Sequence, residues 1–197
     1  MTIKLIAGIG NIGAKYINTR HNCGHKYIYL LSQKFKVHLK YNNILCGYIG
    51  KFQILEHTVK LLIPNSYVNN SGISVSKCVN FYGLSLREIL VAHDELDLYP
   101  GTIKIQLGKR RNESHHGIQN IIDKLGNRYD FYRLRIGIGR PCNKNEIINF
   151  VLNIPSVHEG IQIDFIVNKV VFFTEDIVLN NFVKVMNQLH ISNNIID

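Results

Sequence analysis

The part of the sequence that decides the fold lies near its start, where residues 3 to 13 read IKLIAGIGNIG. The apolar run from Ile3 to Gly8 predicts a short buried strand, and the glycines after it predict a tight loop. In open α/β sheets, ligands bind just beyond the carboxyl ends of the strands. The loop therefore presents one polar residue, Asn11, where a binding site is expected.

The rest of the chain alternates between strand and helix patterns. Apolar runs and alternation predict strands over residues 47–55, 59–63, 88–93, 102–107 and 131–139. Helical spacing occurs over residues 25–35, about 70–81, 117–125 and most of 157–189. Asn69, Asn70 and Ser71 are expected to cap the second of these helices. This order predicts an α/β sandwich with a mixed sheet, as a single domain over residues 1–197.

Charge is distributed unevenly along the chain. The formal net charge is +9, and residues 1 to 55 contain no Asp or Glu. A one-sided basic field attracts polyanions, which indicates nucleic acid or an anionic membrane surface as a partner. An AT-rich coding sequence would also produce many lysines, asparagines and isoleucines, so the charge alone leaves both interpretations open.

The cysteines and the apolar runs bear on the compartment. The four cysteines, at positions 23, 46, 78 and 142, are widely spaced and form no C-x-x-C pair. This is typical of reduced thiols rather than of disulfides or a zinc site. No apolar run reaches the roughly 18 residues of a membrane span, and the start lacks the layout of a secretory signal. We therefore expect a cytoplasmic protein without a membrane partner.

The glycine loop also matches a motif of nucleotide-binding proteins. Residues 8 to 13 have the G-x-G-x-x-G spacing of dinucleotide-binding domains. Such a site also needs a helix that begins in the loop and an acidic residue about 20 residues later. Residues 14 to 20 have no clear amphipathic pattern, and the first acidic residue is Glu56. Both points count against a dinucleotide.

Two segments near predicted strand ends carry groups suited to acid–base chemistry. His21 follows the glycine loop, and Asp94 follows the predicted strand of residues 88–93. A carboxylate fixes the tautomer of a neighbouring histidine, which makes the histidine a general base. Asn11 and Asn69 are placed to orient water or to donate to an oxyanion. The alternative is that His21 is a structural histidine, one of nine in the chain, and that Asp94 belongs to a solvated turn.

Five segments taken together resemble the bacterial peptidyl-tRNA hydrolase family. They occur in the family's order and at about its spacing, at residues 6–13 (IAGIGNIG), 19–24 (TRHNCG), 64–72 (PNSYVNNSG), 91–98 (VAHDELDL) and 133–141 (RLRIGIGRP). The resemblance implies a monomeric α/β/α sandwich around a mixed twisted sheet. It implies hydrolysis of the ester between a peptide and the 3′-terminal ribose of tRNA, which recycles tRNA after ribosomal drop-off. No metal or cofactor is implied.

The resemblance also implies roles for individual residues. His21 would be the base that activates water, and Asp94 would keep it basic. Asn11 would help to distinguish N-blocked peptidyl-tRNA from free aminoacyl-tRNA. The positions that line the site for the peptide and the 3′ end are matched by Tyr16, Tyr67 and Asn69.

Between residues 107 and 117 the chain departs from the family's pattern. His116 stands where the family has a substrate-binding Asn, so the amide's simultaneous donor and acceptor are lost. The phosphate-binding Lys of the family is missing near Gln106. We expect the phosphates to be contacted instead by Lys104, Arg135, Lys109, Arg110 and Arg111. An RNA-binding module that keeps the fold but has lost turnover remains an alternative.

Overall fold

The structure is a computed structural model, and it describes residues 1–108 and 115–191. Within these residues the strands are β1 (Leu5–Gly8), β2 (Lys40–Asn42), β3 (Gly47–Ile54), β4 (His57–Pro64), β5 (Ile89–Glu95), β6 (Ile103–Leu107) and β7 (Tyr132–Gly137). The α-helices are α1 (Cys23–Lys34), α2 (Ser71–Tyr82), α3 (His116–Lys124), α4 (Ile147–Leu152), α5 (Val157–Phe172), α6 (Thr174–Val178) and α7 (Phe182–Ile191). Short 3₁₀ helices include η1 (Ala14–Tyr16), η2 (Arg20–Asn22) and η3 (Val68–Asn70).

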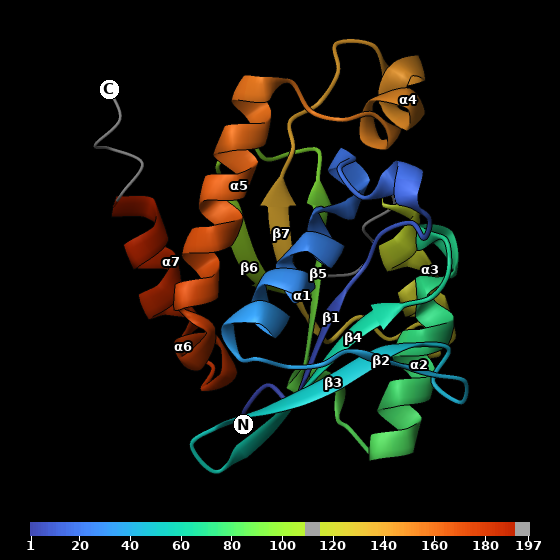
Figure 1. Cartoon of the computed structure of the whole chain (residues 1–197), viewed down its shortest axis with the longest axis vertical. Helices are drawn as coiled ribbons and strands as arrows, with labels where there is room; N and C mark the ends of the chain where they lie inside the picture. The colour runs from blue at the N-terminus through green and yellow to red at the C-terminus, as the bar shows by residue number, and fades with distance from the viewer. Residues whose placement is uncertain (109–114, 192–197) are drawn as a thin grey trace.

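The strands form one sheet in the order β2-β3-β4-β1-β5-β7-β6 (Figure 1). β1 pairs in parallel with β4 and β5, and β5 pairs in parallel with β7. β2 with β3, β3 with β4 and β6 with β7 are antiparallel pairs. The sheet is therefore mixed, as the adjacent strand patterns predicted.

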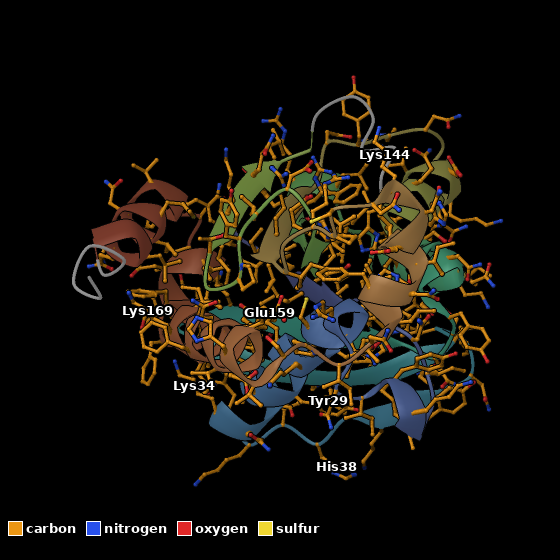
Figure 2. The ribbon with its side chains drawn as sticks, turned by 90° about the horizontal axis from the view of Figure 1, so that it is seen from above. Tyr29, Lys34, His38, Lys144, Glu159 and Lys169 are labelled. Atoms are coloured by element: carbon orange, nitrogen blue, oxygen red, sulfur yellow. The ribbon has the colours of Figure 1, made fainter. Side chains whose placement is uncertain are left out.

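Helices cover both faces of this sheet. α1 and α5 lie side by side over one face, where Lys34 of α1 donates to the carbonyl of Val171 in α5 at 2.8 Å (Figures 1 and 2). α2 and α3 lie over the other face. Successive residues of β1 point to opposite faces, so Ile6 belongs to the first core and Leu5 and Ala7 belong to the second. The predicted α/β/α sandwich is thus confirmed.

Two glycines allow the first helix to approach the central strands. A Cβ on Gly8 would clash with the carbonyl of Gly24, and a Cβ on Gly24 would clash with the carbonyls of Ile9 and Ala92. Since neither residue has a side chain, α1 begins directly against the carboxyl ends of β1 and β5. This close contact brings η2, with His21, to the edge of the sheet.

The predicted elements are present with their ends shifted by a few residues, and β2 and α4 were not predicted. Both are short, with three and six residues. The expected side-chain cap of α2 was wrong, because Asn70 makes no side-chain capping bond. The N–H of Ser71 is instead bonded to the carbonyl of Val68 in η3, which leads directly into the helix. Within the described part of the chain, none of the helices has the length and hydropathy to cross a bilayer.

Candidate active site

A cavity of about 570 Å³ opens at the carboxyl ends of β1 and β5. Its walls come from the glycine loop with η1, from η2, from the segment after β4, and from the start of α3 and α4. Seven residues predicted from the sequence line it: Asn11, Tyr16, His21, Tyr67, Asn69, Asp94 and His116. The fold therefore gathers these residues, which are far apart in the chain, around one space.

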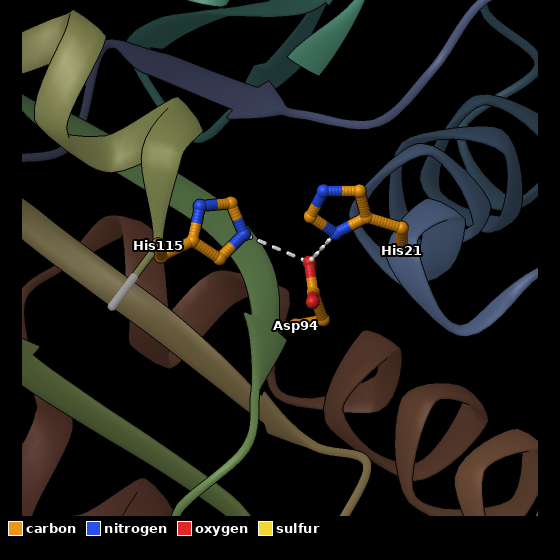
Figure 3. A group of neighbouring side chains, drawn as sticks. All are labelled: His21, Asp94 and His115. Atoms are coloured by element: carbon orange, nitrogen blue, oxygen red, sulfur yellow. Dashed lines mark hydrogen bonds and ion pairs between the residues drawn. The ribbon is translucent and has the colours of Figure 1, made fainter. Parts of the chain in front are cut away.

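His21 and Asp94 form a direct pair in this cavity (Figure 3). Nδ1 of His21 lies 2.8 Å from Oδ1 of Asp94, whose side chain is only 2% exposed. An ionised carboxylate can only accept, so Nδ1 carries the hydrogen and donates it. Nε2 of His21 is then the unprotonated nitrogen. A lone pair held in this orientation is what a general base requires.

The charge state of the pair follows from its surroundings. Burial alone would raise the pKa of Asp94, but attraction and hydrogen bonds from His21 and His115 outweigh it and hold that pKa well below its usual range. Burial lowers the pKa of His21, whereas the charge and hydrogen bond of Asp94 raise it by more. The net result is a histidine that is more basic than usual beside a carboxylate that stays ionised.

A third side chain, His115, completes this group and was not predicted. Its Nε2 lies 2.8 Å from the same oxygen, Oδ1 of Asp94 (Figure 3). Its Nδ1 accepts from the N–H groups of Gly117 and Ile118, at 3.1 and 3.3 Å, and so caps α3. Because Nδ1 must keep its lone pair for these donors, Nε2 carries the hydrogen and His115 is a fixed donor to Asp94.

His93 lies behind this group and supports it. Its ring is fully buried and meets the ring of His115 at a centroid distance of 4.8 Å and an angle of 76°. Burial, with a smaller effect of His115, lowers the pKa of His93 well below its ordinary value, so the ring is neutral. Nδ1 lies 2.6 Å from the carbonyl of Asp94 and donates to it. His93 thus packs against His115 without adding charge.

Asn11 is held by a second residue that the sequence did not single out, Asn22. The Asn22 side chain accepts from the backbone N–H of Asn11 at 2.8 Å and donates to its carbonyl at 2.9 Å. The side-chain oxygen of Asn11 accepts from the N–H of Val68 at 2.9 Å. This donor fixes which way the Asn11 amide points, and it leaves the NH₂ group for the cavity that Asn11 lines.

Aromatic and polar side chains form the outer wall. The rings of Tyr16 and Tyr67 meet edge to face, with centroids 6.3 Å apart. Tyr67, Asn69 and His116 are exposed, so a large substrate can reach them. His116 is the first residue of α3 and lines the cavity, as its position in the sequence predicted.

Two of the predicted phosphate contacts, Lys104 and Arg135, do not line this cavity. Lys104 of β6 is exposed and stands opposite Arg135 of β7 in the sheet. The guanidinium of Arg135 donates to Glu95 at 2.8 Å and to Gln106 at 2.9 Å. Gln106, near which the resemblance places a lysine, accepts from the arginine and adds no charge. The other predicted contacts, Lys109, Arg110 and Arg111, lie outside the described residues.

The group of His21, Asp94 and His115 also has the composition of a metal site. Their ligand atoms all lie within 4.8 Å of one another. A metal on Nε2 of His115 would move the hydrogen to Nδ1, where two backbone N–H groups already point. Metal binding would thus break the cap of α3, so the hydrogen bonds favour the metal-free arrangement of these residues.

Comparisons with known proteins agree with the fold. The sequence profile of the family described as peptidyl-tRNA hydrolase matches residues 5–196. A peptidyl-tRNA hydrolase of Sodalis glossinidius is 43% identical over 190 residues, covering 96% of this chain and 97% of the relative. One of Serratia proteamaculans is 42% identical over 189 residues, covering 96% of each. A crystal structure of peptidyl-tRNA hydrolase from Acinetobacter baumannii has a TM-score of 0.89 at 36% identity, covering 95% of this chain and 94% of that one.

The fold and the relatives place this protein among the hydrolases. The chain belongs to the peptidyl-tRNA hydrolase family. The resemblance carried by the five sequence segments is thereby confirmed.

Proposed function

We propose that this protein hydrolyses the ester between the peptide and the 3′-terminal ribose of peptidyl-tRNA, with His21 as the general base. The observation that carries the proposal is the pair of hydrogen bonds to one oxygen of Asp94. They fix the tautomer of His21 and leave its Nε2 as a proton acceptor in a cavity large enough for an ester and its flanking groups.

The reaction needs one proton to move twice. Nε2 of His21 takes a proton from water as the water oxygen attacks the ester carbonyl, and Asp94 stabilises the imidazolium that forms. One N–H of the Asn11 amide and the amide of Asn69 are the donors for the tetrahedral oxyanion, which leaves the second N–H of Asn11 for another acceptor. When the C–O bond to the ribose breaks, His21 returns the proton to the ribose oxygen. The products are an intact tRNA 3′ end and a free peptide carboxylic acid, which ionises by releasing the second proton of the water to solvent.

The orientation of Asn11 explains a preference for N-blocked substrates. Its NH₂ faces the cavity because its oxygen is bonded to Val68. An N-acylated substrate offers a carbonyl that accepts from this NH₂. A free aminoacyl-tRNA offers an ammonium group, which has only donors, so donor would face donor. The enzyme therefore spares aminoacyl-tRNA and recycles the tRNA of peptidyl-tRNA that is released by ribosomal drop-off.

The tRNA is bound by contacts of two kinds. Tyr16 and Tyr67 provide aromatic surfaces for the single-stranded 3′ end. Lys104, with the basic run at residues 109–111, contacts phosphates of the acceptor arm in a sequence-independent way. We place the enzyme in the cytoplasm as a monomer, which agrees with four unpaired cysteines.

The test is release of N-acetyl-aminoacyl groups from tRNA by the wild type and by His21→Ala. Loss of a general base lowers the rate by about 10²–10⁴-fold. His158→Ala is the control, since His158 is exposed on α5 and outside the cavity. Equal rates for the wild type and His21→Ala would contradict the mechanism. A wild type that binds tRNA but releases nothing would favour the alternative of an RNA-binding module.

A further inference from the structure

The three residues of η2 bind three different parts of the active site. His21 is bonded to Asp94, and the side chain of Asn22 is bonded to the backbone of Asn11. The third residue, Arg20, has a side chain that is only 8% exposed and that binds the end of α4. This short helix lies beyond the carboxyl ends of β5 and β7 and forms one wall of the active-site cavity (Figure 1). Nothing in the mechanism described above uses the arginine.

Arg20 holds the end of α4 through backbone carbonyls. Its Nη1 lies 3.2, 3.3 and 3.2 Å from the carbonyl oxygens of Phe150, Asn153 and Ile154, which share the two hydrogens of this nitrogen. The backbone N–H of Arg20 donates to the same carbonyl of Asn153 at 3.2 Å. The guanidinium also lies over the ring of Phe150, 4.0 Å from its centroid. The last carbonyls of a helix have no partner within the helix, so a cation that binds them stabilises its end.

The position of α4 depends on such contacts because the helix is short. Six residues are too few for a helix to be stable in isolation, so packing and end contacts must hold it. Val151 packs in the core, whereas Ile148 is 67% exposed. The residues of α4 that line the cavity are Ile147, Ile148, Val151 and Leu152. A movement of the helix end would therefore displace an apolar wall of the active site.

A salt bridge fixes the arginine from the side of α5. Nη2 of Arg20 donates to Oε2 of Glu159 at 2.8 Å. The same oxygen accepts from the backbone N–H and the hydroxyl of Ser156, at 2.8 and 2.6 Å, in the capping box at the start of α5. The planar fork of the guanidinium lets one side chain bind α4 and α5 together with a fixed geometry. A lysine has the same charge on a single ammonium group, so it cannot reproduce both sets of contacts.

We propose that Arg20 is a positioning residue, which holds α4 as a wall of the active-site cavity and thereby sets the affinity for the substrate. The inference rests on the proposed function. Arg20 acts through α4, whereas proton transfer depends on His21 and Asp94. The contacts with the wall are the same for the ground state and the transition state, so displacement of the wall raises KM and leaves kcat nearly unchanged.

The first test compares Arg20→Lys with the wild type in the hydrolysis of N-acetyl-aminoacyl-tRNA. We expect KM to rise about fivefold and kcat to stay within about twofold. Lys34→Met is the control, because it also removes a bond between a cation and a carbonyl at the end of a helix. Lys34 donates to the carbonyl of Val171 in α5 and does not line the cavity, so this variant should leave both constants unchanged. An unchanged KM in Arg20→Lys, with or without a fall in kcat, would overturn the proposal.

A double-mutant cycle tests whether Arg20 acts through α4. Ile148→Ala trims the wall on α4, and Tyr67→Ala trims the wall on the segment after β4. We expect the combined effect of Arg20→Lys and Ile148→Ala on KM to be smaller than the product of the single effects, because the displaced helix has already lost the contact. The effects of Arg20→Lys and Tyr67→Ala should multiply. Independent effects in both pairs would overturn the proposal.

Hydrogen exchange separates this inference from the proposed function, because it requires no activity. We expect the backbone amides of Val151 and Leu152 in α4 to exchange about tenfold faster in Arg20→Lys than in the wild type. The amides of residues 167–171 in α5 should keep their rates. Faster exchange in both helices would indicate a general loss of stability and would overturn the proposal.

The two measurements together show which statement fails. If α4 alone exchanges faster but the wild type hydrolyses no ester, the proposed function fails and the contact by which Arg20 holds α4 stands. If hydrolysis is intact but the exchange of α4 is unchanged in Arg20→Lys, the inference about Arg20 fails alone.

Discussion

His21 and His25 lie four residues apart in the same segment, yet their surroundings make them opposite in chemistry. His21 faces the ionised Asp94, which raises the pKa of the ring against the effect of burial. His25 has no carboxylate partner, and burial lowers its pKa to about 4. One ring is therefore prepared to accept a proton, and the other is kept neutral.

This contrast shows that a neighbouring carboxylate, more than the position in the chain, makes a histidine a general base. His21 lies in η2, just before α1, and His25 lies in the first turn of α1. Only His21 has a tautomer fixed by a carboxylate. Substitutions of the carboxylate or of the groups that hold it should therefore lower the hydrolytic activity more than substitutions in the wall of the active-site cavity.

The largest effect is expected from Asp94→Asn, which removes the difference between the two histidines. The amide can donate to Nδ1 of His21, which turns the ring to the wrong tautomer and removes the charge that stabilises imidazolium. We expect kcat to fall by about 10²–10⁴-fold in the hydrolysis of N-acetyl-aminoacyl-tRNA. Asp97→Asn is the control, since Asp97 is exposed and paired with Arg140. A variant that keeps more than a tenth of the activity would show that Asp94 is not needed.

The second effect is on stability and concerns His25. Its pKa is about 4 when folded and about 6.5 when unfolded, so below pH 6.5 the unfolded state binds a proton that the folded state does not. The contribution of neutral His25 to the free energy of unfolding is fully present above pH 6.5. It is lost as the pH falls to 4, by up to about 3 kcal/mol. His25→Phe should therefore lose less unfolding free energy than the wild type over this range. Parallel curves in urea denaturation at each pH would contradict it.

The contribution of His21 to the free energy of unfolding should depend on pH in the opposite direction. Its raised pKa means that the folded state holds a proton more tightly than the unfolded state. That contribution is present below the unfolded pKa and is lost as the pH rises through the folded one.

The third prediction distinguishes the two functions of His115, its hydrogen bond to Asp94 and its cap of α3. His115→Ala should lower activity by about 10–100-fold, because a hydrogen bond to a charged group contributes about 1.5–3 kcal/mol. It should also lose about 0.5–2 kcal/mol of stability through the cap of α3. His115→Asn restores a capping side chain but does not reproduce the imidazole donor to Asp94. If the Asn variant recovers activity together with stability, His115 acts only as a cap.

The smallest effect is expected from Asn22→Asp. The carboxylate still accepts from the N–H of Asn11 but cannot donate to its carbonyl. We expect kcat/KM to fall about tenfold, which corresponds to the loss of one buried hydrogen bond. Asn43→Asp makes the same charge change at an exposed position and serves as the control. Equal kinetics for the two variants would show that Asn22 does not position Asn11.

Much of the fold could be predicted, because buried central strands are continuous apolar runs and the helices have clear spacing. β2 and α4 escaped prediction because three and six residues carry too little periodic signal. In the site, His115 was visible only as one of two adjacent histidines, and its bonds to Asp94 and to α3 exist only after folding. The only signal for Asn22 was its position next to His21. The lowered pKa of His25 depends on its burial in the folded chain, which the spacing of residues in the sequence does not reveal.

The central claim is that Asp94 makes His21 the base, and one measurement tests it most directly. The pH dependence of kcat/KM is compared with the titration of the His21 imidazole by NMR, in the wild type and in Asp94→Asn. The account predicts that the acidic limb of the rate profile follows the His21 titration in the wild type. In the variant, both should move to lower pH together, since burial then acts without the carboxylate. A rate profile that does not follow His21 in the wild type, or a His21 titration unchanged by Asp94→Asn, would contradict the account.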